Sequence, residues 1–332
     1  MVAQLDDAFR EVGGSRAVRL ASWALFEGRP LTTRGRLVNP LVLGLHRLHA
    51  VLPISRAVER PVFIMGMGRS GTTLLGRALA VHRDVGFLNE PKALWHVAVG
   101  REDVTGSYSR GAARYRLADD DADDRAGRRL RRLFGAYLRW TGRRRVVDKN
   151  PEVVYRVPFV RAVFPDARCL LAVRDGWDVC RSVEAWSERH GVDRRGERHD
   201  WWGAARRKWD LLLDQVAAQE ADLAPHVETM RAWRDQRQMA AVEWTLAMRY
   251  GLRHVAAAPE SVAVVRYEQL VASPGQTLAE VLRFCSLPDD PAVIDYARRV
   301  VRPARTRGPF ELEPPIAPAF GEVAARLEYP TP

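Results

Sequence analysis

The sequence predicts an α/β fold in which a P-loop-like parallel sheet carries helices on both faces and a helical insertion on one side. Short apolar runs of strand character alternate with longer helical patterns between residues 61 and 300, as in parallel sheets with helical crossovers. A glycine-rich turn joins the first of these runs to a helix. With 332 residues, 47% hydrophobic and 28% charged, the composition is that of a globular protein.

The expected elements follow in chain order. Helical, partly amphipathic patterns fill residues 1–60 and end near Pro53 and the basic run at 56–60. The predicted strands are residues 61–65, 85–88, 145–148, 168–173 and 262–265. The predicted helices are residues 72–82, a surface helix within 101–145, 153–163, 177–187, most of 200–257, 277–285 and 292–300. We therefore predict an N-terminal helical segment, 1–60, packed on a domain that spans 61–332.

Charge and cysteine content limit the class of protein. The net charge of +11 favours an anionic ligand or surface. The three cysteines, Cys169, Cys180 and Cys285, have neither disulfide-framework nor zinc-site spacing. The apolar stretch 37–54 is interrupted by prolines, histidines and Arg47, so it does not predict a membrane span. We expect a cytoplasmic protein, and peripheral contact with a membrane stays open.

Lysine is rare in this chain. Only three of the 52 basic residues are lysines: Lys92, Lys149 and Lys208. The arginine and alanine bias is typical of a GC-rich genome, in which most basic residues are encoded as arginine. Each retained lysine is therefore a position to examine for a specific role.

The turn from Gly66 to Gly71 predicts a phosphate-binding loop. Such a turn directs backbone N–H groups at an anion, and the N-terminus of the following helix adds partial positive charge. The loop has the glycine spacing and Thr73 of a nucleotide-hydrolysing loop, but Thr72 stands where that loop has lysine. The nearest cation is Arg69, which suits a single 5′-phosphate with a further anionic group. The simpler alternative is a tight strand–helix turn without a ligand.

Two segments resemble PAPS-dependent sulfotransferases, which use 3′-phosphoadenosine 5′-phosphosulfate (PAPS) as donor. Residues 68–75, GRSGTTLL, are similar to the family's 5′-phosphosulfate loop in its arginine-bearing form. The resemblance implies that the donor's 5′ end contacts Gly68, Arg69, Ser70, Gly71, Thr72 and Thr73. Residues 164–182, FPDARCLLAVRDGWDVCRS, resemble the family's 3′-phosphate element. There the resemblance assigns the phosphate contacts to Arg174 and Ser182.

Three more positions resemble tyrosylprotein sulfotransferases in particular. Glu90 corresponds to that group's catalytic glutamate, and Lys149, within DKNP, corresponds to its catalytic lysine. Tyr267, within YEQL, corresponds to a tyrosine that contacts the 3′-phosphate. A last 3′-phosphate contact is expected from Arg305 or Arg307, of which Arg307 is our choice.

The resemblance specifies the donor and leaves the acceptor open. It covers residues 61–186 and 262–286 and is thin elsewhere, so we expect acceptor or lid regions at 101–145 and 187–257. Asn89 precedes Glu90 where the tyrosylprotein group has paired acidic residues. We therefore expect a small-molecule, lipid or carbohydrate acceptor and not a peptide tyrosine. No nucleic-acid partner is expected, and the oligomeric state stays open.

The residue types fit in-line sulfuryl transfer. Glu90 is the expected base for an acceptor hydroxyl, with a pKa raised by burial. Arg69 and Lys149 are expected to stabilise the developing negative charge, and Lys149 to act as acid toward the leaving 5′-phosphate. Because the protein supplies these cations, no metal is expected. After the reaction the donor leaves as 3′-phosphoadenosine 5′-phosphate (PAP).

Other interpretations remain open at this stage. A P-loop phosphotransferase and a non-catalytic basic nucleotide- or nucleic-acid-binding module are the alternative functions. Five tryptophans are candidates for an acceptor wall or an adenine stack, although tryptophans at helical spacing more often belong to the core: Trp201, Trp202, Trp209, Trp233 and Trp244. His190 and His199 flank a polar stretch that is a candidate lid. The run Arg128–Arg132 is either an anion-binding face or a solvated helix face.

Overall fold

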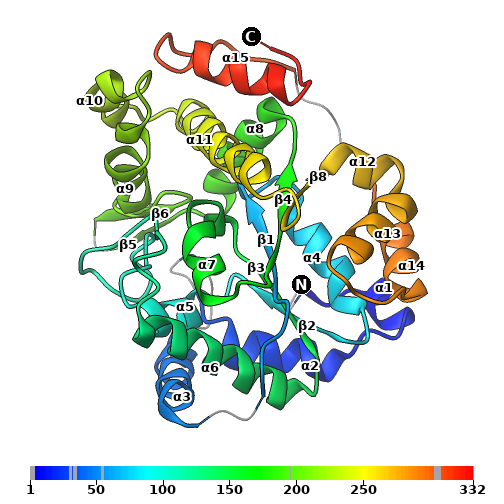
Figure 1. The fold of residues 1–332 in the computed structure, drawn as a ribbon. Coiled ribbons are helices and arrows are strands. Elements are labelled where there is room, and N and C mark those ends of the chain that lie inside the picture. The colour runs from blue at the N-terminus through cyan, green and yellow to red at the C-terminus, as the bar shows by residue number, and fades with distance from the viewer. Residues whose placement is uncertain are drawn as a thin grey trace.

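A five-stranded parallel sheet in the order β2-β3-β1-β4-β8 forms the centre of the molecule (Figure 1). The structure is a computed structural model that describes residues 4–29, 32, 36–53, 56–194, 196–302 and 308–331. The strands are β1 (Val62–Gly66), β2 (Val85–Asn89), β3 (Arg145–Lys149), β4 (Arg168–Val173) and β8 (Val262–Arg266). Every predicted strand is present, and four of the five end one residue later than predicted. The predicted α/β fold is confirmed.

Helices cover both faces of the sheet because strand residues alternate between two hydrophobic cores. In β1, Val62 and Ile64 belong to one core, and Phe63 and Met65 belong to the other. The first core is closed by α4 (Thr72–Val81), α13 (Pro274–Phe284) and α14 (Pro291–Val300). The second is closed mainly by α5 (Lys92–Val99), α6 (Asp124–Thr141), α7 (Val157–Val163), α8 (Gly176–His190) and α11 (Gln236–Ala257).

The N-terminal helices lie against this layered core. They are α1 (Asp7–Glu11), α2 (Arg16–Ala21), the π-helical turn Ser22–Phe26, the 3₁₀ turn Arg36–Val38 and α3 (Asn39–Val51). Phe9 of α1 packs edge-on against Tyr296 of α14, and Arg19 of α2 donates to the main-chain oxygen of Phe87 in β2. These contacts attach the segment to the sheet, while a domain boundary at residue 60 stays a prediction.

The helix predicted within residues 101–145 is α6, which exposes only one side. Leu130, Leu133 and Phe134 are buried, and the Phe134 ring lies 6.2 Å from that of Phe63 in β1. The apolar stripe therefore seats the helix on the sheet, and the arginines project outward. In the part of the chain that the structure describes, no helix is both long and apolar enough to cross a membrane.

The prediction of continuous helix from residue 200 is wrong at its start. A small antiparallel sheet precedes the helices, formed by β5 (Val192–Arg194), β6 (Glu197–Asp200) and β7 (Gly203–Ala204). Ala205 and Arg206 have φ angles of 48° and 64°, which no right-handed helix accommodates. The helical region then consists of α9 (Arg207–Gln215), the 3₁₀ turns Ala217–Gln219 and Ala224–His226, α10 (Val227–Arg231) and α11.

The predicted helix 153–163 is divided in two. A 3₁₀ turn, Pro151–Tyr155, is followed by α7, with Arg156 between them at φ −133°. Pro158 is in the first turn of α7, where it cannot donate the backbone hydrogen bond that a continuous helix needs. Arg156 is buried, and its Nη1 atom lies 2.9 Å from Glu102 Oε2. The remaining helices are α12 (Tyr267–Ala272) and α15 (Ala317–Arg326).

Candidate active site

Most of the predicted site residues lie at the carboxyl edge of the parallel sheet. The strand register pairs Asn89 of β2 with Lys149 of β3. Glu90 and Arg174 are the first residues after β2 and β4, and Tyr267 is the first after β8. Because the strands are parallel, residues that follow different strands emerge at the same edge. Segments more than a hundred residues apart in the chain therefore converge there.

The glycine loop joins β1 to α4 and is shaped by two aromatic rings. Gly71 has a φ of 87°, and a Cβ atom there would lie 2.5 Å from the Tyr267 ring. At Gly68 a Cβ atom would lie 2.5 Å from the ring of Trp201. Arg69 has a φ of 75° despite its side chain, a strained conformation of the kind that collects at ligand-binding turns.

The residues predicted to hold the donor's phosphates contact one another beside this loop. Arg69 Nε donates to Ser182 Oγ at 2.9 Å. The Arg174 guanidinium lies over the Tyr267 ring, 4.3 Å from its centroid. Trp244 Nε1 donates to the main-chain oxygen of Arg174 at 3.1 Å and holds that turn in place. The 5′ and 3′ elements of the resemblance thus form one continuous surface.

Two buried polar atoms on this surface have no hydrogen-bond partner among the described residues. They are Ser70 Oγ in the loop and Arg174 Nε. Asp178 Oδ2 lies 3.0 Å from Nη2, at the other end of the Arg174 guanidinium. Buried polar groups are normally paired, so these two atoms indicate that an external ligand completes the site.

Glu90 and Lys149 form a close ion pair at the ends of β2 and β3. Lys149 Nζ lies 2.5 Å from Glu90 Oε1. The Lys149 side chain is 2% exposed and that of Glu90 is 39% exposed, so the carboxylate is the accessible member. Glu90 has a φ of 51°, and its N–H donates to the main-chain oxygen of Lys149 at 2.7 Å. This strained turn places the carboxylate beside the ammonium group.

The predicted rise in the pKa of Glu90 is wrong. Burial acts in that direction, but attraction to Lys149 and Lys92 outweighs it and holds the pKa of Glu90 below its ordinary value. Glu90 is therefore ionised at neutral pH. Burial raises the pKa of the neighbouring Asp148 to about 8, and Trp95 Nε1 donates to this carboxyl at 2.7 Å. Asp148 thus stays largely protonated at pH 7 and leaves Glu90 as the anionic partner of Lys149.

A cavity of about 370 Å³ lies in front of this ion pair, and all three lysines of the chain line it. Lys92 Nζ lies 2.6 Å from Glu152 Oε1, and Lys208 Nζ lies 2.6 Å from Glu243 Oε1. With Lys149 and Glu90, the cavity wall thus carries three lysine–glutamate pairs. Lysine is so rare in this chain that chance does not explain three lysines in one cavity. Their convergence indicates a functional surface.

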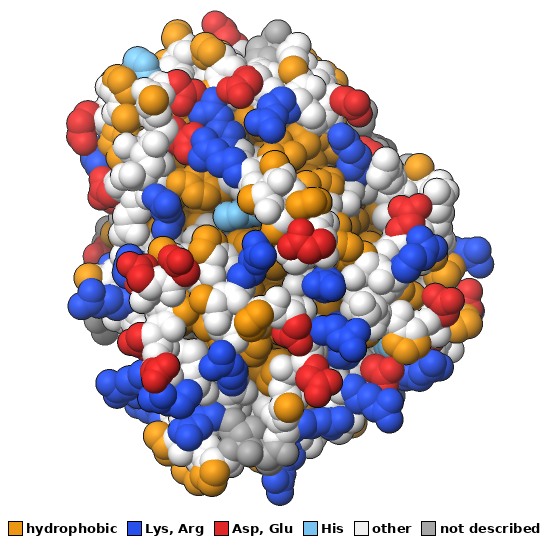
Figure 2. All heavy atoms as spheres, in the orientation of Figure 1, with side chains coloured by type: hydrophobic (Ala, Val, Ile, Leu, Met, Phe, Trp, Pro, Cys, Tyr) orange, Lys and Arg blue, Asp and Glu red, His pale blue; other side chains and the backbone are white. Residues whose placement is uncertain are grey.

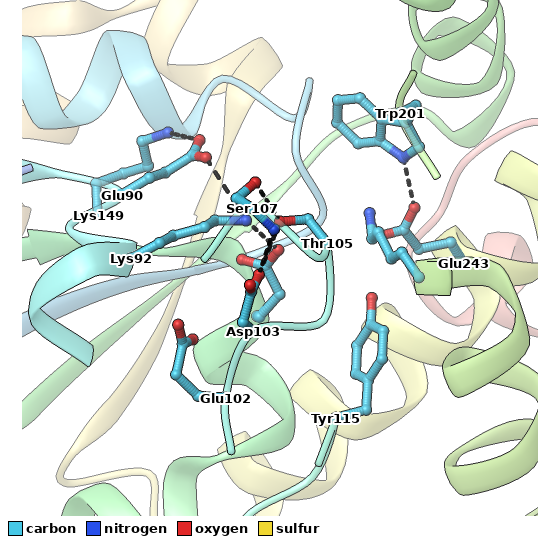
Figure 3. A network of polar contacts seen from close by, with 12 residues as sticks. Glu90, Lys92, Glu102, Asp103, Thr105, Ser107, Tyr115, Lys149, Trp201 and Glu243 are labelled. Atoms are coloured by element: carbon cyan, nitrogen blue, oxygen red, sulfur yellow. Dashed lines mark hydrogen bonds and ion pairs between the residues drawn. The ribbon is translucent and has the colours of Figure 1, made fainter. Parts of the chain in front are cut away.

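The wall opposite Glu90 is built from α9, α11 and the turn between β6 and β7. Trp201 Nε1 donates to Glu243 Oε2 at 2.7 Å, and Lys208 Nζ lies 4.6 Å from the centre of the Trp201 ring. Figure 3 shows Trp201 and Glu243 on one side of the site, with Glu90 and Lys149 on the other. The side chains of Lys208 and Glu243 are each 6% exposed, so their charges act in a dry environment.

The buried carboxylate of Asp103 organises a loop between these two walls (Figure 3). It accepts hydrogen bonds from the main-chain N–H groups of Ser107 at 3.0 Å, Tyr108 at 2.6 Å and Ser109 at 2.8 Å. The Thr105 hydroxyl donates to the same carboxylate at 3.1 Å. Thr105 and Ser107 line the cavity as a result, so part of the thinly matched region 101–145 contributes to the site.

Four of these charged residues have no role among the sequence predictions: Lys92, Glu152, Lys208 and Glu243. The rarity of lysine was the signal that identifies two of them, because all three lysines converge on one cavity. No comparable signal marks Glu152 or Glu243, since acidic residues are common along the chain.

The other predicted features separate into site and core. Trp201 and His199 line the cavity. Three of the tryptophans are instead buried in the core: Trp202, Trp209 and Trp244. Arg305 and Arg307 lie outside the described residues. Within the described ranges, no three histidine, cysteine, aspartate or glutamate side chains come together as candidate metal ligands.

Comparison with known proteins finds a family match and two distant relatives. The model of the sulfotransferase family matches residues 61–230. The nodulation protein NoeE of Sinorhizobium fredii is 28% identical over 243 residues, which cover 71% of this chain and 51% of NoeE. Protein-tyrosine sulfotransferase 1 of Danio rerio is 22% identical over 267 residues, which cover 76% of this chain and 62% of that protein. The chain thus spans less than two thirds of the length of either relative.

Solved sulfotransferase structures are also similar to this chain. The sulfotransferase domain from the curacin biosynthetic pathway aligns at a TM-score of 0.48 with 16% identity, covering 84% of this chain and 100% of that domain. Sulfotransferase STF9 from Mycobacterium avium aligns at a TM-score of 0.48 with 14% identity, covering 98% of this chain and 93% of that protein. The family match over residues 61–230 includes the glycine loop, Glu90, Lys149, Arg174 and Ser182. The chain therefore belongs to the sulfotransferase family of transferases.

Proposed function

We propose that this chain transfers the sulfuryl group of PAPS to a hydroxyl group of an acceptor and releases PAP. The observation that carries the proposal is that Glu90 and Lys149 share one cavity with Arg69 and the glycine loop. A carboxylate, two cations and an anion-binding turn thus surround a single reaction centre. These are the groups that group transfer to a hydroxyl requires.

The surface around the loop fits a donor that carries anionic groups at both its 5′ and 3′ ends. The loop and the N-terminus of α4 suit the 5′-phosphosulfate. Arg174 and Ser182 suit the 3′-phosphate, and the unpaired Ser70 Oγ and Arg174 Nε atoms provide hydrogen bonds for such groups. Thr72, in the lysine place of triphosphate-binding loops, disfavours ATP as the donor.

The protein's own groups then perform the chemistry. When bound, the donor supplies the sulfuryl group that the acceptor hydroxyl attacks in line. Glu90, ionised because of Lys149 and Lys92, accepts the hydroxyl proton. Arg69 and Lys149 stabilise the charge that develops on the leaving oxygen, and Lys149 is the candidate acid there. The burial of Lys149 strengthens this stabilisation, because water screens a buried charge less.

The lining of the cavity favours a neutral acceptor with several hydroxyl groups, such as a saccharide or another polyol. Among the described lining residues, the cations are Arg69, Lys92, Lys149 and Lys208, and the carboxylates are Glu90, Glu152, Asp200 and Glu243. Their charges balance, so a charged acceptor gains nothing overall. Alternating donors and acceptors of hydrogen bonds suit neighbouring hydroxyl groups, and Trp186 and Trp201 offer apolar ring faces. An apolar acceptor would remove water from these ion pairs without offering them hydrogen bonds.

We expect Glu243→Gln to raise the KM for the acceptor about tenfold and to leave the KM for PAPS unchanged. The substitution keeps the shape but removes the charge that holds Lys208 in the acceptor wall. Acceptors are first found by screening saccharides, polyols, phenols and sterols with labelled PAPS and mass spectrometry. Glu228→Gln, at a side chain that is 82% exposed on α10, is the matched control. If only phenols or sterols accept sulfate, or if both KM values rise together, the acceptor assignment is wrong.

We expect saturating PAP to raise the melting temperature by about 5 °C, while ATP with Mg²⁺ has no effect. Arg174→Ala is expected to weaken PAP binding at least about tenfold, since it removes a charged hydrogen-bond donor. Arg161→Ala, at a side chain that is 43% exposed on α7, serves as control. Thermal shift and calorimetric titration measure both effects. Stabilisation by ATP in place of PAP would instead support a phosphotransferase.

A further inference from the structure

The exposed apolar side chains of this protein are concentrated at one place. Nine large hydrophobic side chains are exposed among the described residues, and seven of them lie on or beside α3: Leu37, Val38, Leu41, Leu48, Val51, Leu52 and Trp140. Leu37 is 95% exposed and Leu41 is 69% exposed. Soluble proteins rarely gather apolar side chains in this way without a partner. We call these seven residues the α3 patch.

The centre of the α3 patch is a face of α3 whose opposite face is fixed to the protein. Leu41 and Leu48 are seven residues apart and lie on one side of the helix, and Leu52 is the first residue after its end. On the opposite side Val42, His46 and Ala50 are buried, and His46 Nε2 lies 3.1 Å from the main-chain oxygen of Phe26. The outward leucines are therefore presented on a rigid support.

Helix α6 adds a tryptophan and a band of positive charge beside the patch. The Trp140 side chain is 57% exposed, and its Nε1 donates to His49 of α3 at 3.2 Å. Arg132 Nη1 lies 3.2 Å from the main-chain oxygen of Ala50, which holds the two helices together. Helix α6 carries six arginines and one acidic residue, Asp124 at its start, which pairs with Arg128, and α3 has no acidic residue.

Figure 2 shows orange side chains at the lower end of the molecule, where Figure 1 places α3, with blue side chains around them. Apolar side chains that enter the lipid boundary, a tryptophan at the interface and arginines beside them are the features that bind helices to anionic membrane surfaces. A second copy of this chain fits less well. Two such faces in contact would bring both sets of arginines together, on chains that each carry a net charge of +11.

We infer that the α3 patch, with the arginines of α6, binds the surface of an anionic lipid bilayer without crossing it. The leucines and Trp140 enter the boundary of the acyl chains, while the arginines pair with lipid phosphates and carboxylates. This inference does not depend on the proposed donor or acceptor, because neither helix supplies a residue that lines the cavity.

Co-sedimentation of the 332-residue chain with phosphatidylcholine vesicles, with and without phosphatidylserine, tests the inference. We expect binding only when phosphatidylserine is present, with loss of binding at high salt. The double variant L41Q/L48Q removes apolar contacts, and R47Q/R139Q removes two exposed arginines beside the patch. Each is expected to lower the bound fraction about tenfold. Val264→Gln on β8 and Arg298→Gln on α14 are controls away from the patch and are expected to bind like the parent chain.

Any of three results would overturn the inference. The first is that the parent chain fails to bind vesicles that contain phosphatidylserine. The second is that both double variants bind as well as the parent, and the third is that the bound fraction is the same without phosphatidylserine. Sedimentation velocity tests whether a second copy of the chain binds the patch. A dimer that L41Q/L48Q abolishes would make the patch a self-association surface instead. Melting curves report on folding, and R47Q/R139Q changes only exposed side chains, so it decides the question if the leucine variant fails to fold.

Discussion

Glu90→Gln is expected to lower kcat for sulfate transfer by about 10³-fold, because the amide cannot accept the proton of the acceptor hydroxyl. The substitution preserves the size of the side chain and the backbone turn at φ 51°. PAP binding is expected to change little, since the proposed phosphate contacts come from the glycine loop, Arg174 and Ser182. Single-turnover kinetics with PAPS, together with calorimetric titration of PAP, separates these two effects.

A control distinguishes a lost base from lost structure. Glu228→Gln makes the same chemical change at an exposed position of α10 and is expected to retain parental kcat. The base assignment is wrong if Glu90→Gln transfers sulfate at the parental rate. A melting temperature close to that of the parent would show that any loss of kcat is chemical, because Glu90 is partly exposed and Gln fills the same space.

Lys149→Met is expected to lower kcat by 10²- to 10³-fold, because a buried cation beside the leaving oxygen is lost. A second effect is specific to this pair. Without the ammonium group, burial raises the pKa of Glu90 and only Lys92 opposes it strongly. The acid limb of kcat/KM is therefore expected to move to higher pH in the variant. A pH profile of kcat/KM for both proteins measures this change.

The direction of that movement follows from the protonation of Glu90. In the parent chain its lowered pKa keeps the base ionised, and hence active, until the pH falls below the ordinary value for a glutamate. An acid limb near neutrality in the parent, or an unchanged limb in Lys149→Met, would contradict the proposed coupling. Arg161→Met, at an exposed position of α7, is the control for loss of a cation.

The sequence predicted the sheet well, because each strand is a short apolar run beside a turn. The prediction of helix from residue 200 was wrong, because the local pattern and the packing disagree there. Trp202 followed a helical spacing and is fully buried, yet it belongs to a turn before Arg207. The conformations of Ala205 and Arg206, with φ above 45°, depend on neighbours that no local pattern reveals.

The sequence grouped the glycine loop, Arg174 and Ser182 as a predicted donor site, and it gave no prediction for the opposite wall of the cavity. The loop, Arg174 and Ser182 lie in contiguous motifs whose spacing implies their chemistry. Lys208, Glu243 and Trp201 come from elements that no motif connects. Their convergence depends on how α9 and α11 pack around the cavity, which is a property of the tertiary structure.

Local spacing of residue types was thus enough to predict the fold class and the glycine loop, and the motifs indicated the family. The ionisation of Glu90 and the makeup of the opposite wall of the cavity depend on the folded chain. Coulomb interactions and burial act through space, so the lowered pKa of Glu90 results from Lys149 and Lys92, which reach it from different elements. The same is true of the three lysines, whose rarity is visible in the sequence but whose shared cavity exists only in the folded chain.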